Sequence, residues 1–132
     1  MLIQLVISTV AILLAWTVVD MLLHRFFLRP LYEQNPALWR PFDRLNIALI
    51  YLATFTLIAI FIGLYVLLIQ PKSLGAGLSF GALLGLALGV GSGLGTYIHM
   101  PIPRALALGW LIGGWAKGTV AGAILGMIIT GA

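Results

Sequence analysis

The chain has no cysteine and few charged residues, which make up only 8% of its 132 positions. The absence of cysteine excludes disulfide bonds, thiolate metal sites and cysteine nucleophiles. Acidic residues are scarcer than basic ones, three against seven, and there are only two histidines. A soluble globular domain carries about 25% charged residues. This chain therefore has too little polar surface for a domain that faces water on all sides.

Long apolar stretches are what the sequence has instead, because 62% of its residues are hydrophobic. A helix needs about 20 residues to cross a bilayer, and four stretches are long enough. They predict helices over residues 2–28, 45–69, 74–99 and 105–130. We therefore expect an all-α integral membrane protein, in which residues 1–132 form a single domain of four transmembrane helices in an antiparallel bundle.

Positive charge is concentrated in two of the three connections between the predicted helices. The first connection is flanked by four arginines and the third adds one, whereas the second has a single lysine: Arg25, Arg29, Arg40, Arg44, Arg104 and Lys72. The positive-inside rule places the arginine-bearing connections in the cytoplasm. Both termini are then expected on the opposite side of the membrane. Since this clustering accounts for the basicity of the chain, we expect no nucleic-acid partner.

The only sizeable polar segment is "RPLYEQNPALWRPFDR", residues 29–44. Three prolines predict that it does not continue either neighbouring helix. Arginines alternate with aromatic residues, a composition typical of the headgroup layer. The segment is therefore expected to anchor the protein on anionic lipid, or alternatively to dock a partner protein or ligand. The expected interface residues are Arg29, Tyr32, Trp39, Arg40 and Arg44.

Glycine recurs every four residues in both of the last two predicted helices. In lipid, burial alone does not drive helices together, whereas close backbone approach along a stripe of small residues does. The pattern predicts a tightly packed glycine zipper between residues 74–99 and 105–130; the alternative is that a stripe faces another copy or subunit. The helix-packing residues are Gly77, Gly81, Gly85, Gly89 and Gly93 on the first of these helices and Gly114, Gly118, Gly122 and Gly126 on the second. Gly75, Gly91 and Gly95 leave a second thin surface that could accept a further helix.

Four ionisable residues fall within or at the edge of the predicted helices: Asp20, His24, His99 and Lys117. Charged groups at membrane depth are costly and usually find partners. Counted from the cytoplasmic ends, Asp20 lies ~12 Å deep and Lys117 ~18 Å deep, a difference that a lysine side chain can span. We therefore expect an Asp20–Lys117 contact between the first and last helices. The alternatives are a snorkelling lysine with interfacial histidines, or a ligand or proton site.

Patterns for metal, cofactor or nucleophilic chemistry are sparse. Asp20 and His24 share a helix face and His99 could add a third ligand, but no H-E-x-x-H pattern accompanies them, so no metal site is predicted. Haem or pigment ligation by His24 and His99 is geometrically possible, yet no cofactor is predicted from two histidines alone. No serine sits in a G-x-S-x-G elbow, and no phosphate-loop pattern occurs.

The segments "WTVVDMLLHRFFLRPLYEQNPALWRP" and "GTYIHMPIPRALALGWLIGGW" resemble a set of small four-helix bacterial membrane proteins of unassigned function. The shared features are an Asp-x-x-x-His pair late in the first helix, a Tyr…Trp-Arg-Pro loop and a Pro-Ile-Pro turn. The resemblance implies a bacterial cytoplasmic membrane with periplasmic termini. It supplies no activity and no catalytic residue.

These observations together favour a non-enzymatic membrane protein. We expect an accessory or structural subunit that packs beside other membrane subunits or against copies of itself. One alternative is a small transporter or channel that uses Asp20, Lys117, His24 and His99. The other is an electron-transfer subunit that carries haem or pigment on the two histidines.

Overall fold

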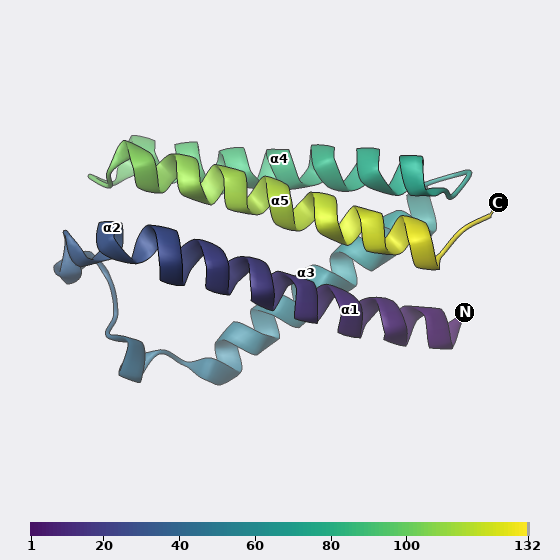
Figure 1. Ribbon diagram of the computed structural model, residues 1–132, viewed down its shortest axis with the longest axis horizontal. Helices are drawn as coiled ribbons and strands as arrows, with labels where there is room; N and C mark the ends of the chain where they lie inside the picture. The colour runs from purple at the N-terminus through teal and green to yellow at the C-terminus, as the bar shows by residue number, and fades with distance from the viewer. Residues whose placement is uncertain (132) are drawn as a thin grey trace.

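The structure, a computed structural model, describes residues 1–131 apart from the side chain of Phe42. It is all-helical, with 85% of the residues in helices. Four helices are long and apolar enough to cross a membrane, namely Leu2–Glu33, Ile47–Leu68, Leu74–His99 and Arg104–Ile128. The prediction of four helices that could each span a membrane is therefore confirmed. Figure 1 shows the two ends of the chain at the same end of the molecule.

The first span is longer than the sequence predicted. It runs through α1 (Leu2–Asp20), the π-helical segment η1 (Met21–Leu28) and α2 (Arg29–Glu33) without a break. The prediction that the first helix ends at residue 28, with Pro30 preventing its continuation, is therefore wrong. Pro30 lies in the first turn of α2, where a missing N–H is tolerated and the fixed φ suits a helix.

The rest of the polar segment forms two short 3₁₀ turns, η2 (Pro36–Leu38) and η3 (Phe42–Arg44). The remaining helices begin and end within two residues of the predicted bounds: α3 (Ile47–Leu68), α4 (Leu74–His99) and α5 (Arg104–Ile128). Side-chain caps explain two of the starts, because Asn46 accepts from the N–H of Leu49 at 3.0 Å and Ser73 accepts from that of Ala76 at 3.1 Å. These bonds satisfy N–H groups that the first helical turn leaves free.

The most extensive packing joins α4 and α5, which lie side by side in Figure 1. The inner face of α4 carries five buried glycines four residues apart, Gly77, Gly81, Gly85, Gly89 and Gly93. A Cβ added to Gly77, Gly81 or Gly85 would lie 2.8 Å from the Cα of Gly126, Gly122 or Gly118, respectively. Further along, the inner glycines of α4 meet the backbone of Leu111 and Ala107. Backbone faces backbone along this pair, with the sequence order reversed.

Two further glycines of α5 allow the first span to pack closely against it. A Cβ on Gly109 of α5 would collide with the side chain of Leu28, and one on Gly113 would collide with that of Leu23. Helix α5 therefore has two thin faces, one against α4 and one against η1. The face against η1 was not predicted from the sequence, because Gly109 and Gly113 do not belong to the series of glycines that recurs every four residues from Gly114 to Gly126.

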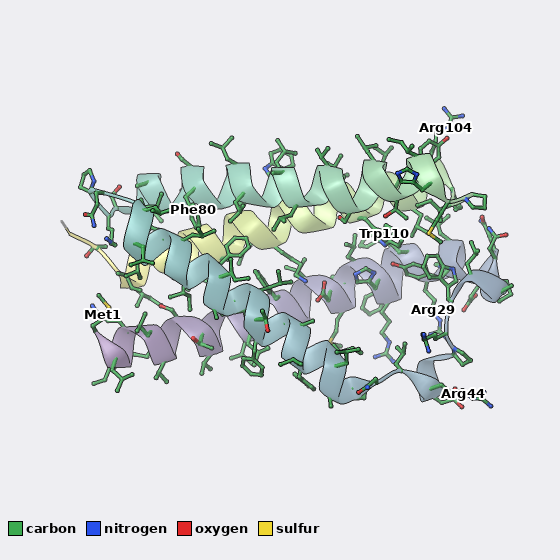
Figure 2. All side chains as sticks on the ribbon, turned by 180° about the vertical axis from the view of Figure 1, so that it is seen from behind. Met1, Arg29, Arg44, Phe80, Arg104 and Trp110 are labelled. Atoms are coloured by element: carbon green, nitrogen blue, oxygen red, sulfur yellow. The ribbon has the colours of Figure 1, made fainter. Side chains whose placement is uncertain are left out.

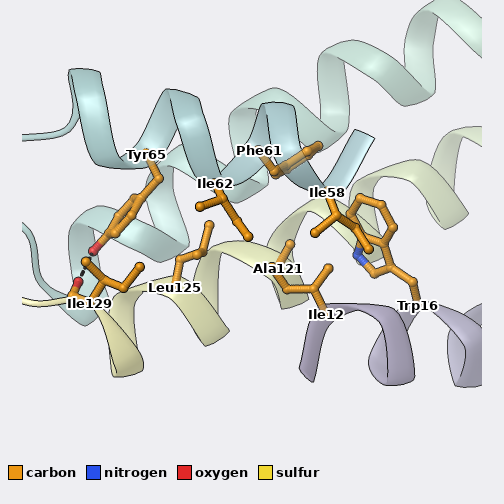
Figure 3. Close-up of a cluster of buried hydrophobic side chains, with 9 residues drawn as sticks. All are labelled: Ile12, Trp16, Ile58, Phe61, Ile62, Tyr65, Ala121, Leu125 and Ile129. Carbon is orange, nitrogen blue, oxygen red and sulfur yellow. Dashed lines mark hydrogen bonds between the residues drawn. The ribbon is translucent and has the colours of Figure 1, made fainter. Parts of the chain in front are cut away.

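The apolar core lies where α1, α3 and α5 meet (Figure 3). Trp16 packs edge-on against Phe61 with ring centroids 5.5 Å apart. Tyr65 is fully buried and donates its hydroxyl proton to the carbonyl oxygen of Ile129 at 2.7 Å. The cluster comprises Ile12, Trp16, Ile58, Phe61, Ile62, Tyr65, Ala121, Leu125 and Ile129.

Helix α3 crosses the other helices obliquely and contributes to this core only from Ile58 onward. Most of its first half is exposed, including Tyr51 and Phe55. In Figure 2, α3 runs away from α4 and α5 toward the end of the molecule marked by Arg44. At the opposite end, Lys72 and Gly131 exchange two backbone hydrogen bonds of 2.6 and 3.0 Å. Helix α3 thus diverges from α4 and α5 toward the arginine-rich end, whereas η1 stays packed against α5 there through Leu23 and Leu28.

Candidate functional site at the π-helical end of the first span

The polar side chains of the first span cluster at its π-helical segment. Asp20 is the last residue of α1, and His24 lies in the first half of η1. π-Helical turns are rare within α-helices and frequently mark functional sites. No pattern in the sequence predicted this π-helical segment, which places Asp20 and His24 beside α5.

Asp20 and Lys117 form the contact expected from their depths in the membrane. The Nζ of Lys117 lies 3.0 Å from Oδ2 of Asp20. Trp16 supports the lysine twice: its ring lies 4.9 Å from Nζ, and its indole N–H donates to the carbonyl oxygen of Lys117 at 2.8 Å. The lysine side chain is 25% exposed and the aspartate side chain 42%. An opposite charge and an aromatic face thus stabilise the one lysine within a span.

His24 joins this ion pair to a tyrosine and a second tryptophan. Its Nε2 lies 3.7 Å from Oδ1 of Asp20, and its Nδ1 lies 2.7 Å from the hydroxyl oxygen of Tyr32. The indole N–H of Trp110 donates to the same hydroxyl oxygen at 2.7 Å. Since indole is a donor only, Tyr32 accepts from Trp110 and directs its own proton to a neutral His24. A protonated His24 would instead donate to Tyr32, so the chain of contacts persists in either state.

Tyr32, Trp39 and Trp110 form an aromatic cluster where the loop packs on α5. The centroid of the Trp39 ring lies 5.1 Å from that of Tyr32 and 5.8 Å from that of Trp110, both edge-on. Such pairs add about 0.5–1.5 kcal/mol beyond burial. The indole nitrogen of Trp39 is buried and has no acceptor within the described part of the chain. An unsatisfied buried donor costs roughly 1–3 kcal/mol, which marks this position as one where a ligand oxygen would be stabilising.

Two clefts of similar size meet at His24. One, of about 590 Å³, is lined by Asp20, Met21, His24, Arg25 and Arg29. The other, of about 600 Å³, lies between the loop and α5 and is lined by His24, Tyr32, Leu38, Trp39, Arg40, Leu45 and Trp110. Two smaller hollows, of about 230 and 260 Å³, continue along α5 past Lys117 toward Phe61. The clefts are mostly apolar, with basic side chains at the loop end.

Of the remaining site candidates, His99 and Arg44 line neither of the two larger clefts, whereas Arg29 lines the first one with Asp20 and His24. His99 is exposed at the end of α4 and makes no side-chain hydrogen bond or ion pair with residues 1–131. Arg29 pairs with Glu33 at 3.0 Å on the surface of α2. Arg44 is exposed in η3. Arg29 and Arg44 thus lie at the same end of the molecule as the aromatic cluster, as expected from the sequence. Of the three predicted interface arginines, Arg40 alone lines the cleft beside that cluster.

The haem hypothesis fits this geometry poorly. Both ring nitrogens of His24 already face Tyr32 and Asp20, so an iron atom would have to displace one of them. No group of three His, Cys, Asp or Glu side chains suited to a metal ion occurs among residues 1–131.

Trp16 and Trp110 are the participants that sequence reasoning missed. The sequence does contain a sign that Trp110 belongs to the site. Trp110 and Lys117 are seven residues apart and so share one face of α5. The pairing of Tyr32 with Trp110 had no such signal, since 78 residues separate them.

Comparison with known proteins found no matching family model, no matching curated protein and no matching solved structure.

Proposed function

We propose that this protein is a non-enzymatic subunit of a membrane assembly, built from further copies of itself. In this proposal the four spans form an antiparallel bundle whose rigid unit is the glycine zipper between α4 and α5. The protein lies in a bacterial cytoplasmic membrane with both termini periplasmic, as the distribution of arginines favours. Its role is to contribute packing surface and lipid contacts to the assembly.

The observation that carries this proposal is an outer stripe of small residues on α4. Gly91 and Gly95 are four residues apart, and a Cβ at either position would meet nothing within 4 Å. Ala87 extends the stripe by one further turn and is exposed. The inner glycines of the same helix, by contrast, meet the backbone of α5 directly.

Gly91 and Gly95 make no close contact within the single chain that would offset the cost of glycine in a helix. Glycine in a helix costs about 1 kcal/mol relative to alanine, and Gly91 and Gly95 gain no contact in return. A small-x-x-x-small stripe in an apolar helix is the surface on which two membrane helices approach closely. Because a two-fold contact places the same stripe on both partners, a second copy of this chain suits it well.

Five threonine hydroxyls within the spans are engaged by the backbone, which agrees with a role without catalysis. Five threonines each donate to the carbonyl oxygen four residues earlier in the same helix: Thr9, Thr17, Thr54, Thr56 and Thr119. A nucleophile needs a base within hydrogen-bond reach, and these hydroxyls bond to backbone instead.

The test compares the oligomeric state of three proteins in a mild detergent by native mass spectrometry. We expect the wild type to form oligomers, and Gly91→Leu combined with Gly95→Leu to run as a monomer. Ala59→Leu, which adds bulk at an exposed position of α3, should leave the oligomers intact. Crosslinking through a cysteine at position 87 in native membranes provides a second readout. A wild type that is monomeric in both measurements would refute self-assembly.

A further inference from the structure

The clefts that meet at His24 combine uncompensated positive charge with apolar walls. Arg25 lines the first cleft and Arg40 the second. Neither arginine forms an ion pair with the residues that the structure describes, 1–131 without the Phe42 side chain. The nearby carboxylates of Asp20 and Glu33 are already neutralised, by Lys117 and Arg29 respectively. The local balance therefore favours an anion.

We propose that these clefts hold one anionic phospholipid of the phosphatidylglycerol type, with its phosphate between Arg25 and Arg40. This goes beyond the general attraction of an arginine-rich loop for anionic lipid, because it assigns one headgroup to a defined site. Arginine offers a planar set of donors that matches phosphate oxygens. His24 lines both clefts and so lies where such a headgroup would bridge them.

The orphaned indole N–H of Trp39 adds a donor to this site. Trp39 lines the same cleft as Arg40 and His24, and its nitrogen has no acceptor in the described structure. A phosphate or glycerol oxygen that enters this cleft would supply the acceptor after a small rotation of the ring. Trp39 therefore favours a ligand with several oxygen atoms over a simple apolar occupant.

The apolar walls favour a lipid over a soluble anion. Leu38, Leu45 and Trp110 line the aromatic cleft beside the basic groups. Leu57, Phe61 and Leu88 line the hollow that continues toward the core. This hollow lies beside α3, which diverges from α4 and α5 in Figure 2. An acyl chain can thus extend from the headgroup site along α5 within the depth of the span.

The test measures how much lipid stays bound to the full chain after purification from vesicles of equal phosphatidylglycerol and phosphatidylcholine. By native mass spectrometry we expect one retained phosphatidylglycerol, preferred by about tenfold, the size that a charged hydrogen bond supplies. Arg25→Gln and Arg40→Gln should each remove most of this preference. Arg44→Gln is the matched control, because Arg44 lies on the same segment outside the clefts, and it should retain the wild-type preference.

Three results would overturn the proposal. Equal retention of the two lipids would exclude headgroup selection, and an equal loss in Arg44→Gln would indicate attraction to the loop as a whole. Displacement of the lipid by millimolar glycerol phosphate would assign the site to a soluble anion. Trp39→Phe keeps an aromatic ring at this position but removes the five-membered ring of the indole together with its N–H. A lowered preference in a variant with unchanged circular dichroism would support the assigned donor, and an unchanged preference would remove Trp39 from the site.

Discussion

Two glycine-to-alanine substitutions, Gly118→Ala and Gly63→Ala, should change stability in opposite directions although each adds a single methyl group. Gly63 lies in α3, where a Cβ meets nothing within 4 Å. Alanine there should stabilise the helix by about 0.5–1 kcal/mol. Gly118 lies in α5 against α4, where a Cβ would lie 2.8 Å from the backbone nitrogen of Gly85.

The magnitude at Gly118 follows from that distance. The Cβ would also collide with the Cα of Gly85 and the carbonyl oxygen of Gly81. Since carbon atoms in contact prefer about 3.5–4.0 Å, α4 and α5 would have to separate by roughly 1 Å. Overpacking of this kind costs typically 1–3 kcal/mol, and the helical preference of alanine offsets up to about 1 kcal/mol of it. We expect Gly118→Ala to be destabilising by about 1–2 kcal/mol, and to differ from Gly63→Ala by roughly 2 kcal/mol.

The assay is unfolding in mixed micelles of a mild detergent and dodecyl sulfate, followed by circular dichroism. The two midpoints should move to opposite sides of the wild type. If both variants shift in the same direction by a similar amount, α4 and α5 are not packed backbone to backbone in the membrane. The reasoning about the glycine stripe would then fail.

Three further substitutions test the polar group at the end of the first span. Asp20→Asn and Lys117→Gln should each destabilise the protein, and the double variant should be less destabilised than the sum of the two. We expect a coupling of about 0.5–1.5 kcal/mol in the same unfolding assay, because the partial exposure of Asp20 limits it. Strict additivity would indicate that the two charges do not interact. Tyr32→Phe leaves both the Trp110 indole N–H and Nδ1 of His24 without their partner, so we expect a loss of about 1–3 kcal/mol and a red shift in tryptophan emission. An unchanged emission spectrum and midpoint would show that Tyr32 is not held between them.

The four spans could be predicted from the sequence because each consists of one continuous apolar stretch of residues. Hydrophobic length sets the number of helices in a membrane protein. The caps at Asn46 and Ser73 and the prolines before α5 set where the helices begin. Position along the helices was also enough to predict the Asp20–Lys117 contact, since 1.5 Å per residue converts sequence number into depth.

The candidate site followed from the sequence only in part. Asp20, His24 and Lys117 stood out because charge within an apolar stretch is conspicuous. Trp16 and Trp110 did not, because aromatic residues are ordinary in spans and at their ends, and Tyr32 was expected only as a lipid or partner contact. Tyr32 was assigned to a loop since Pro30 was expected to end the helix, and this error hid its contact with His24.

The sequence by itself determined that the chain has four helices long and apolar enough to cross a membrane, and which helices carry glycine stripes. Those properties depend on composition and on the period of a single helix. Only the tertiary structure decided that the first helix continues through a π-helical segment to Glu33 and that α3 crosses obliquely. It alone brought Tyr32 and Trp110 together across 78 positions. The physical reason is that in lipid the helices have no hydrophobic preference for one another, so side-chain fit between distant segments determines their arrangement.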